Sequence, residues 1–115
     1  MNVRTVQERL QLENVAGEKG LDNEVLGGYC GDLLSDVMAN ADRGALWFTI
    51  QAHQNIVAVA VLKELAGIVL VNGHAPDEET KAKADEEHIP ILFSRLPAYH
   101  LAGRLYELGI GRIEA

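Results

Sequence analysis

Three short apolar runs recur along the second half of the chain, each followed by a polar turn and a helical stretch. They occupy residues 45–50, 67–71 and 90–93. Aliphatic and aromatic side chains fill these runs without strict alternation, which is typical of strands buried on both faces of a sheet. Successive runs begin about 22 residues apart, which leaves room for a helical crossover between parallel strands. The pattern predicts an α/β fold: a layered fold with a mainly parallel sheet and flanking helices.

Helical periodicity and turn residues place the remaining elements. The expected helices cover residues 3–10, a stretch from Leu33 to a stop at residues 42–44, and residues 54–65, 77–87 and 97–108. A glycine-rich segment at residues 25–31 predicts a further strand that bends or admits a close neighbour. Asp32 is expected to cap the helix that follows this strand.

The helix expected at residues 54–65 contains the β-branched run Ile56–Leu62, which resembles a strand when taken alone. A strand here would leave very short links on both sides, so we predict a helix, with Gln54 and Asn55 as its caps. A helix that is apolar all round is normally buried on two sides. We expect its second side to meet another copy of the chain in a homodimer, an expectation that a monomer in light scattering would contradict.

Length and charge limit the classes of partner. At 115 residues the chain fits a single domain, over residues 1–115. Its formal net charge of −7 works against nucleic-acid partners, which are held through phosphate backbones. The longest apolar run has seven residues, against the roughly 20 that span a bilayer, so we expect no membrane span. The first residues lack a leader pattern and Cys30 is the only cysteine, which favours the reducing cytoplasm.

Polar residues gather directly after the three apolar runs. In parallel sheets ligands bind beyond the carboxyl ends of the strands, where loops and helix N-termini converge. The expected ligand-binding residues are Thr49, His53, Gln54, Asn55, Asn72, Gly73, His74, Ser94 and Arg95. Their side chains supply hydroxyl, amide, imidazole and guanidinium groups. Gly73 supplies a backbone N–H that we expect to face the ligand. This set suits a nucleotide or a phosphorylated small molecule, although capping and turn formation also account for it.

The sequence contains few of the patterns on which catalysis usually depends. His53 and His74 could share a metal ion with Asp32 or Asp77, since imidazole and carboxylate are normal ligands. Their spacing matches no known metal-binding motif, so we expect no metal site. Neither a G-x-x-x-x-G-K-[ST] loop nor a G-x-G-x-x-G motif is present, which removes the usual machinery of phosphoryl transfer and dinucleotide chemistry. Cys30 is interpreted as a small buried residue rather than a nucleophile. We therefore expect no catalytic residue and no cofactor.

Two segments together resemble a stand-alone DRTGG domain, Gly27–Asn40 and Trp47–Ala60, and the resemblance extends over residues 3–110. Such domains occur beside CBS domains and in phosphotransacetylases, and are similar in fold to the N-terminal domain of HPr kinase/phosphorylase. His53-Gln54-Asn55 stands where the family has Asp-Arg, and Val71-Asn72-Gly73 where it has Thr-Gly-Gly. These substitutions remove the charges of the Asp-Arg pair, which implies a different ligand. The resemblance implies regulation and no kinase activity, because the phosphate-binding loop of that kinase lies in its other domain.

The resulting hypothesis is a non-catalytic, cytoplasmic regulatory or adaptor module that forms a homodimer and senses a small anionic metabolite or nucleotide. One alternative is a purely structural subunit that docks on a larger enzyme through the helix containing Ile56–Leu62. The other is a small enzyme that uses His53 and His74 as acid and base. Turnover that persists after both histidines are replaced by alanine would eliminate this last version.

Overall fold

The structure is a computed structural model that describes residues 1–112. Its elements, in chain order, are α1 (Val3–Leu10), β1 (Glu13–Ala16), the 3-10 helix η1 (Glu18–Gly20), β2 (Gly27–Cys30), α2 (Leu34–Asn40), β3 (Ala45–Thr49), α3 (Asn55–Leu62), β4 (Gly67–Leu70), α4 (Glu78–Glu87), β5 (Ile91–Phe93) and α5 (Ala98–Glu107). The four predicted strands and five predicted helices are therefore present, with ends that differ by at most three residues.

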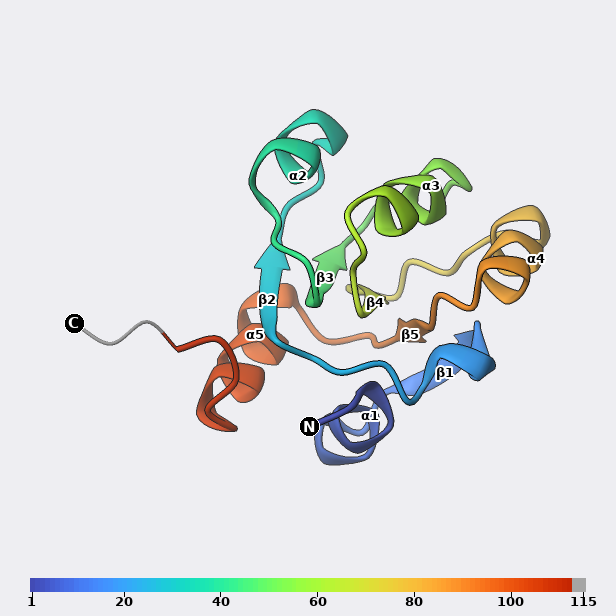
Figure 1. Cartoon of the computed structure of the whole chain (residues 1–115). Helices are drawn as coiled ribbons and strands as arrows, with labels where there is room; N and C mark the ends of the chain where they lie inside the picture. The colour runs from blue at the N-terminus through green and yellow to red at the C-terminus, as the bar shows by residue number, and fades with distance from the viewer. Residues whose placement is uncertain (113–115) are drawn as a thin grey trace.

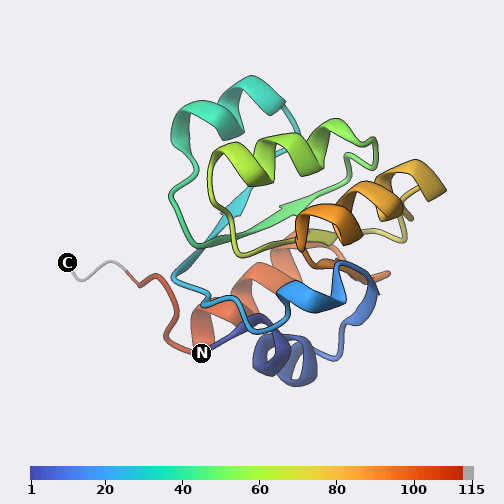
Figure 2. The same cartoon turned by 45° about the vertical axis from the view of Figure 1, so that its right-hand side comes forward.

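One five-stranded sheet runs through the molecule in the order β1-β5-β4-β3-β2. Strands β2 to β5 are parallel neighbours in chain order, and β1 pairs antiparallel with β5. The crossover helices α2, α3 and α4 cover one face of the sheet, whereas α1 and α5 cover the other (Figures 1 and 2). The predicted layered α/β fold with a mainly parallel sheet is confirmed.

Each face of the sheet has its own apolar core, because side chains alternate between the faces along a strand. Trp47 packs among the residues beneath α2, α3 and α4. Its neighbours Leu46 and Phe48 belong to the opposite core, beneath α1 and α5. All five residues of β3 are consequently buried, which explains why this strand has no polar alternation in the sequence.

Helix α3 lies between two other helices of the same chain. It contacts α2 on one side and α4 on the other. Ile56, Val57, Val59 and Ala60 are buried. Val61 and Leu62 remain 39% and 70% exposed, so part of the apolar surface of the helix is uncovered. The helix ends earlier than expected because Glu64 adopts a left-handed conformation, with φ at 53°. Gln54 is the N-cap residue as predicted, although its side chain makes no capping bond, and Asn55 is the first helical residue rather than a cap.

Strand β1 is not among the predicted elements. It pairs Glu13 with Phe93, and the register shifts by a bulge between Asn14 and Ala16. The Asn14 side-chain amide donates to the Ala16 carbonyl oxygen at 2.9 Å, within this bulge. A short strand with one fully buried residue has too little apolar periodicity to be found from the sequence.

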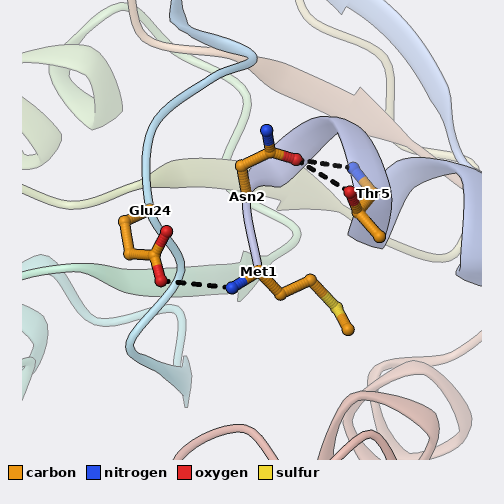
Figure 3. Close-up of polar contacts among 4 residues, drawn as sticks. All are labelled: Met1, Asn2, Thr5 and Glu24. Carbon is orange, nitrogen blue, oxygen red and sulfur yellow. Dashed lines mark hydrogen bonds and ion pairs between the residues drawn. The ribbon is translucent and has the colours of Figure 1, made fainter.

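Figure 3 shows three polar contacts of the N-terminal segment. The Asn2 side chain caps α1 by accepting from the Thr5 backbone N–H and hydroxyl, both at 2.9 Å. The amino group of Met1 pairs with the Glu24 carboxylate at 3.1 Å. The Met1–Glu24 pair, together with the backbone bonds from Val3 N–H to the Asn23 carbonyl oxygen and from Val25 N–H to that of Met1, holds α1 beside the segment that leads into β2. Within residues 1–112, no helix has the length and apolarity needed to cross a membrane.

Candidate functional site

The four loops that follow β2, β3, β4 and β5 lie next to one another because these strands are parallel and adjacent. We call this edge the strand-end rim; it comprises residues 31–32, 49–55, 72–74 and 94–95. Every predicted ligand-binding residue lies on it. Hydrogen bonds connect the first loop to the second and the third to the fourth, whereas the second and third are linked through Val71 and Thr80, which lie just outside the rim.

Asp32 occupies the first loop of the rim and is held by the second. Its Oδ1 accepts from the Thr49 hydroxyl at 2.9 Å and from the Ile50 backbone N–H at 3.0 Å. The expectation that Asp32 caps α2 is wrong: the N-cap residue is Leu33, which makes no side-chain capping bond. Asp32 remains exposed. The rim therefore presents a carboxylate whose orientation is fixed by its bonds to Thr49 and Ile50.

Two side chains of the β3 segment reinforce the loop that contains Asp32. The Trp47 indole donates to the Gly31 carbonyl oxygen at 2.8 Å. The Gln51 amide donates to the Asp32 carbonyl oxygen at 2.9 Å. Thr49 is buried, and its hydroxyl also accepts from the Gln51 N–H at 3.1 Å. Thr49 therefore supports the rim from inside and does not present its hydroxyl to solvent.

The second and third loops are joined through the backbone and through helix α4. The Val71 N–H donates to the Thr49 carbonyl oxygen at 3.1 Å. Thr80, which is fully buried on α4, donates its hydroxyl to the Ala52 carbonyl oxygen at 2.9 Å. This bond holds the loop that carries His53 and Gln54 against the start of α4.

Replacing Thr80 with valine is expected to lower the free energy of unfolding by about 1–2 kcal/mol, because the Ala52 carbonyl loses its partner in a buried setting. Chemical denaturation followed by circular dichroism measures this change. Lys81→Ala, on the same helix but half-exposed, is the control and should change stability by less than about 0.5 kcal/mol. Equal effects of the two variants would contradict the role assigned to Thr80.

The third loop uses its backbone N–H groups for internal bonds. Asn72 donates to the Leu96 carbonyl oxygen at 3.0 Å, Gly73 to that of Ser94 at 2.9 Å and His74 to that of Val71 at 3.1 Å. The expectation that the Gly73 N–H faces a ligand is wrong, because Ser94 on the neighbouring loop already accepts from it. The tight turn needs left-handed residues at Asn72 and Gly73, with φ values of 56° and 76°.

Arg95 is the cation of the fourth loop. It is exposed, and its guanidinium carbon lies 5.7 Å from the centre of the Phe93 ring. A Cβ atom built at Gly73 would lie 3.8 Å from the Nη1 atom of Arg95, so the guanidinium of Arg95 extends over the third loop. Within residues 1–112, Arg95 forms no ion pair and its guanidinium makes no hydrogen bond. The adjacent Ser94 hydroxyl accepts from the Leu96 N–H at 3.0 Å and shapes the turn.

The two rim histidines, His53 and His74, are exposed on neighbouring loops. Asp77 caps α4 by accepting from the Thr80 N–H at 2.8 Å. This bond, and to a lesser degree the charge of His53, lower the pKa of the Asp77 carboxyl below its ordinary value. Within the part of the chain that the structure describes, no group of three His, Cys, Asp or Glu side chains is placed to hold a metal ion.

Cys30 lies outside the rim, on the outermost strand of the sheet. It is exposed rather than buried as expected, because β2 has a strand neighbour on only one side. Partial burial of its sulfur, followed by the charge of Asp32, raises the pKa of the thiol. A protonated thiol is a poor nucleophile at neutral pH.

The rim thus brings some predicted residues into contact and separates others. Gly73, Ser94 and Arg95 meet where the third and fourth loops join, whereas His53, Gln54 and Asn55 form an exposed group at the start of α3. Asp32 is the residue that the prediction missed as a ligand-binding candidate. The strand-end rule, applied to β2 as it was to the other three strands, would have identified it.

No protein-family model and no curated protein sequence matches the chain. A solved structure resembles it: the CBS and DRTGG domains of the regulatory region of Clostridium perfringens pyrophosphatase, complexed with the activator diadenosine tetraphosphate. The likeness has a TM-score of 0.68 at 13% sequence identity, and covers 90% of this chain. The chain spans 45% of the length of that structure. At this identity the likeness shows the fold, so the chain is similar in architecture to a domain of that regulatory region.

Proposed function

We propose that the chain is a non-catalytic, cytoplasmic regulatory or adaptor module that senses a nucleotide at the strand-end rim. The fold similarity supports a regulatory role, because the neighbouring structure is the regulatory region of an enzyme and holds a nucleotide activator. The observation that carries the proposal is the exposed guanidinium of Arg95, which extends over the tight turn at Gly73. An arginine in this position is available to a phosphate group.

The phosphate end of such a nucleotide would lie at the third and fourth loops. Arg95 offers a planar fork of donors that matches two phosphate oxygens. His74 is exposed on the adjoining loop and adds a donor. The chain is acidic overall, with a net charge of −7, so these local groups must provide the attraction for an anion.

The sugar end would lie at the first loop. Asp32 is exposed, and its Oδ1 is held by Thr49 and Ile50. A fixed carboxylate at a strand end is suited to accept hydrogen bonds from the hydroxyl groups of a ribose. Carboxylate and guanidinium at opposite ends of one rim would thus distinguish a nucleotide from a simple phosphate.

Replacing Arg95 with alanine is expected to weaken binding of diadenosine tetraphosphate and of ATP by about 10- to 100-fold, because charge-assisted hydrogen bonds to phosphate are lost. Isothermal titration calorimetry on the full chain measures the affinity. Arg43→Ala is the matched control: Arg43 is also exposed, but it precedes β3 and therefore lies at the opposite end of the strands.

A thermal-shift experiment tests the binding itself. A nucleotide at 100 times its Kd should stabilise the folded chain by about 2.7 kcal/mol. The absence of any shift with diadenosine tetraphosphate, ATP and inorganic phosphate would reject nucleotide sensing. An equal loss of affinity in the Arg95 and Arg43 variants would reject the rim as the site and point to nonspecific charge attraction.

A further inference from the structure

The outer face of α5 is an exposed tyrosine-bearing surface. Leu101 and Leu105 of this helix are buried against the sheet. On the opposite side, Tyr99 is 91% exposed and Tyr106 is 52% exposed, with Gly103 between them. Large aromatic rings that gather on one exposed helix face mark an interaction surface more often than scattered single residues do.

A broad depression of about 810 Å³ lies along this face; Cys30, Tyr99, Gly103 and Tyr106 contribute to its lining. No heavy atom outside the helix lies within 4 Å of a Cβ built at Gly103, so the helix backbone forms its open floor. A second hollow of about 240 Å³ shares Cys30 and Tyr106 and continues over Gly28. The residues of the strand-end rim line neither hollow.

The depression adjoins the free edge of the sheet. Among residues 1–112, strand β2 is the last strand on this side, and α5 lies beside it in both views (Figures 1 and 2). Gly111 packs close to Gly27 at the start of the strand, and Gly28, Tyr29 and Cys30 continue beyond that contact. Unpaired peptide groups on a sheet edge are an attachment point for another chain. The tyrosine-bearing helix face and the edge thus form one continuous surface.

The positions of His100 and Glu107 on α5 favour a second copy of the same chain, whereas Arg104, which also lines the depression, donates to the Arg9 carbonyl oxygen at 2.8 Å. His100 lies three residues before Gly103 and Glu107 lies four residues after it, and both line the depression. Suppose that two α5 helices pack antiparallel about a twofold axis at Gly103. His100 of each copy then lies at nearly the same height along the helix axis as Glu107 of the other copy. The same arrangement places Tyr99 opposite Glu107, and the symmetry forms each contact twice.

Gly103 is the residue that permits this packing. Since it has no side chain, two helix backbones can approach closely at the axis, with the tyrosine rings on either side filling the two depressions. From these observations we infer that the α5 face, together with the β2 edge, is a homodimer interface. This interface differs from the α3 surface expected from the sequence, which α2 and α4 already flank. It does not depend on the proposed nucleotide site.

Analytical ultracentrifugation over a range of micromolar concentrations tests the proposal on the full chain. Wild type is expected to show a concentration-dependent dimer, and Gly103→Arg should raise the dimer Kd by about 100-fold or more, because two like charges meet at the axis. Ala58→Arg, exposed on α3, is the matched control and should leave the Kd unchanged. Circular dichroism establishes that both variants are folded.

Disulfide trapping provides a second, geometric readout. In a Cys30→Ser background, Gly103→Cys should form a disulfide-linked dimer on oxidation, because residues at a twofold axis lie within bonding range. Ala58→Cys in the same background should not. A wild-type chain that is monomeric at every concentration would overturn the proposal, since the face would then be free or belong to a different partner. Dissociation by Ala58→Arg but not by Gly103→Arg would overturn it in favour of α3.

Discussion

Replacing Trp47 with alanine is expected to lower the free energy of unfolding by about 3–5 kcal/mol. Trp47 is fully buried in the core beneath α2, α3 and α4. Its removal leaves a cavity between the sheet and these helices, and it also leaves the Gly31 carbonyl without its donor. Trp47 is the only tryptophan, so denaturation should be followed by circular dichroism rather than by intrinsic tryptophan fluorescence.

Trp47→Phe separates packing from hydrogen bonding. The phenyl ring fills much of the indole site but cannot donate to Gly31, so the expected loss of stability is smaller, about 1–3 kcal/mol. If the proposed nucleotide site is correct, this variant should also bind ATP more weakly, because Gly31 precedes Asp32 on the rim.

The control for this coupling is Phe48→Ala. Phe48 is also buried in β3 but faces the opposite core, so its loss should cost about 3–5 kcal/mol while the Trp47 bond to Gly31 survives. Nucleotide affinity, measured at a temperature at which both variants are folded, should fall only for the Trp47 variant. A similar decrease in affinity for both would show that general destabilisation, not the Gly31 bond, affects the rim.

The parallel strands and their helices are predictable from the sequence because their patterns are local. The runs that contain Trp47 and Val69 are apolar throughout, since helices cover both faces of the sheet. The β-branched segment Ile56–Leu62 is ambiguous by propensity alone, and the need for a crossover between parallel strands decides correctly in favour of a helix.

Features that depend on distant partners were not predictable in this way. Asp32 has the sequence position of a helix cap, but its carboxylate instead accepts from Thr49, a contact between two different loops. The N–H of Gly73, which is expected from the sequence to face a ligand, instead donates to the Ser94 carbonyl oxygen of the neighbouring loop. Such pairings are set by the register between strands, which a single sequence does not reveal.

The surface of α5 illustrates a different limit. Its amphipathic pattern accounts for the buried side, with Leu101 and Leu105 against the sheet. The sequence does not show that the other side adjoins a free strand edge, because the position of β2 at the end of the sheet follows from the strand order. For the same reason Cys30 is exposed although its neighbours in the sequence suggest burial.

Strand β1 is held in place by a close backbone approach at Gly17, and replacing this glycine with alanine is expected to destabilise the fold by more than about 3 kcal/mol. Gly17 has a left-handed conformation, with φ at 69°. An added Cβ would overlap the Ile89 carbonyl oxygen and lie 2.7 Å from the Pro90 nitrogen, both of them backbone atoms that cannot move independently. The Gly17 N–H also donates to Asp85 at 2.7 Å, so relief of the overlap would break this bond.

Gly109→Ala is the control that separates the steric overlap at Gly17 from the strain of the left-handed conformation. Gly109 is also left-handed, with φ at 88°, but no heavy atom lies within 4 Å of an added Cβ. Its replacement should therefore cost only the conformational strain, about 1–2 kcal/mol. Urea denaturation of both variants gives the comparison, and hydrogen exchange of the β1 amides shows whether the loss is local. If Gly17→Ala cost no more than Gly109→Ala, the close packing of β1 against the start of β5 would be wrong, since the left-handed strain is common to both positions.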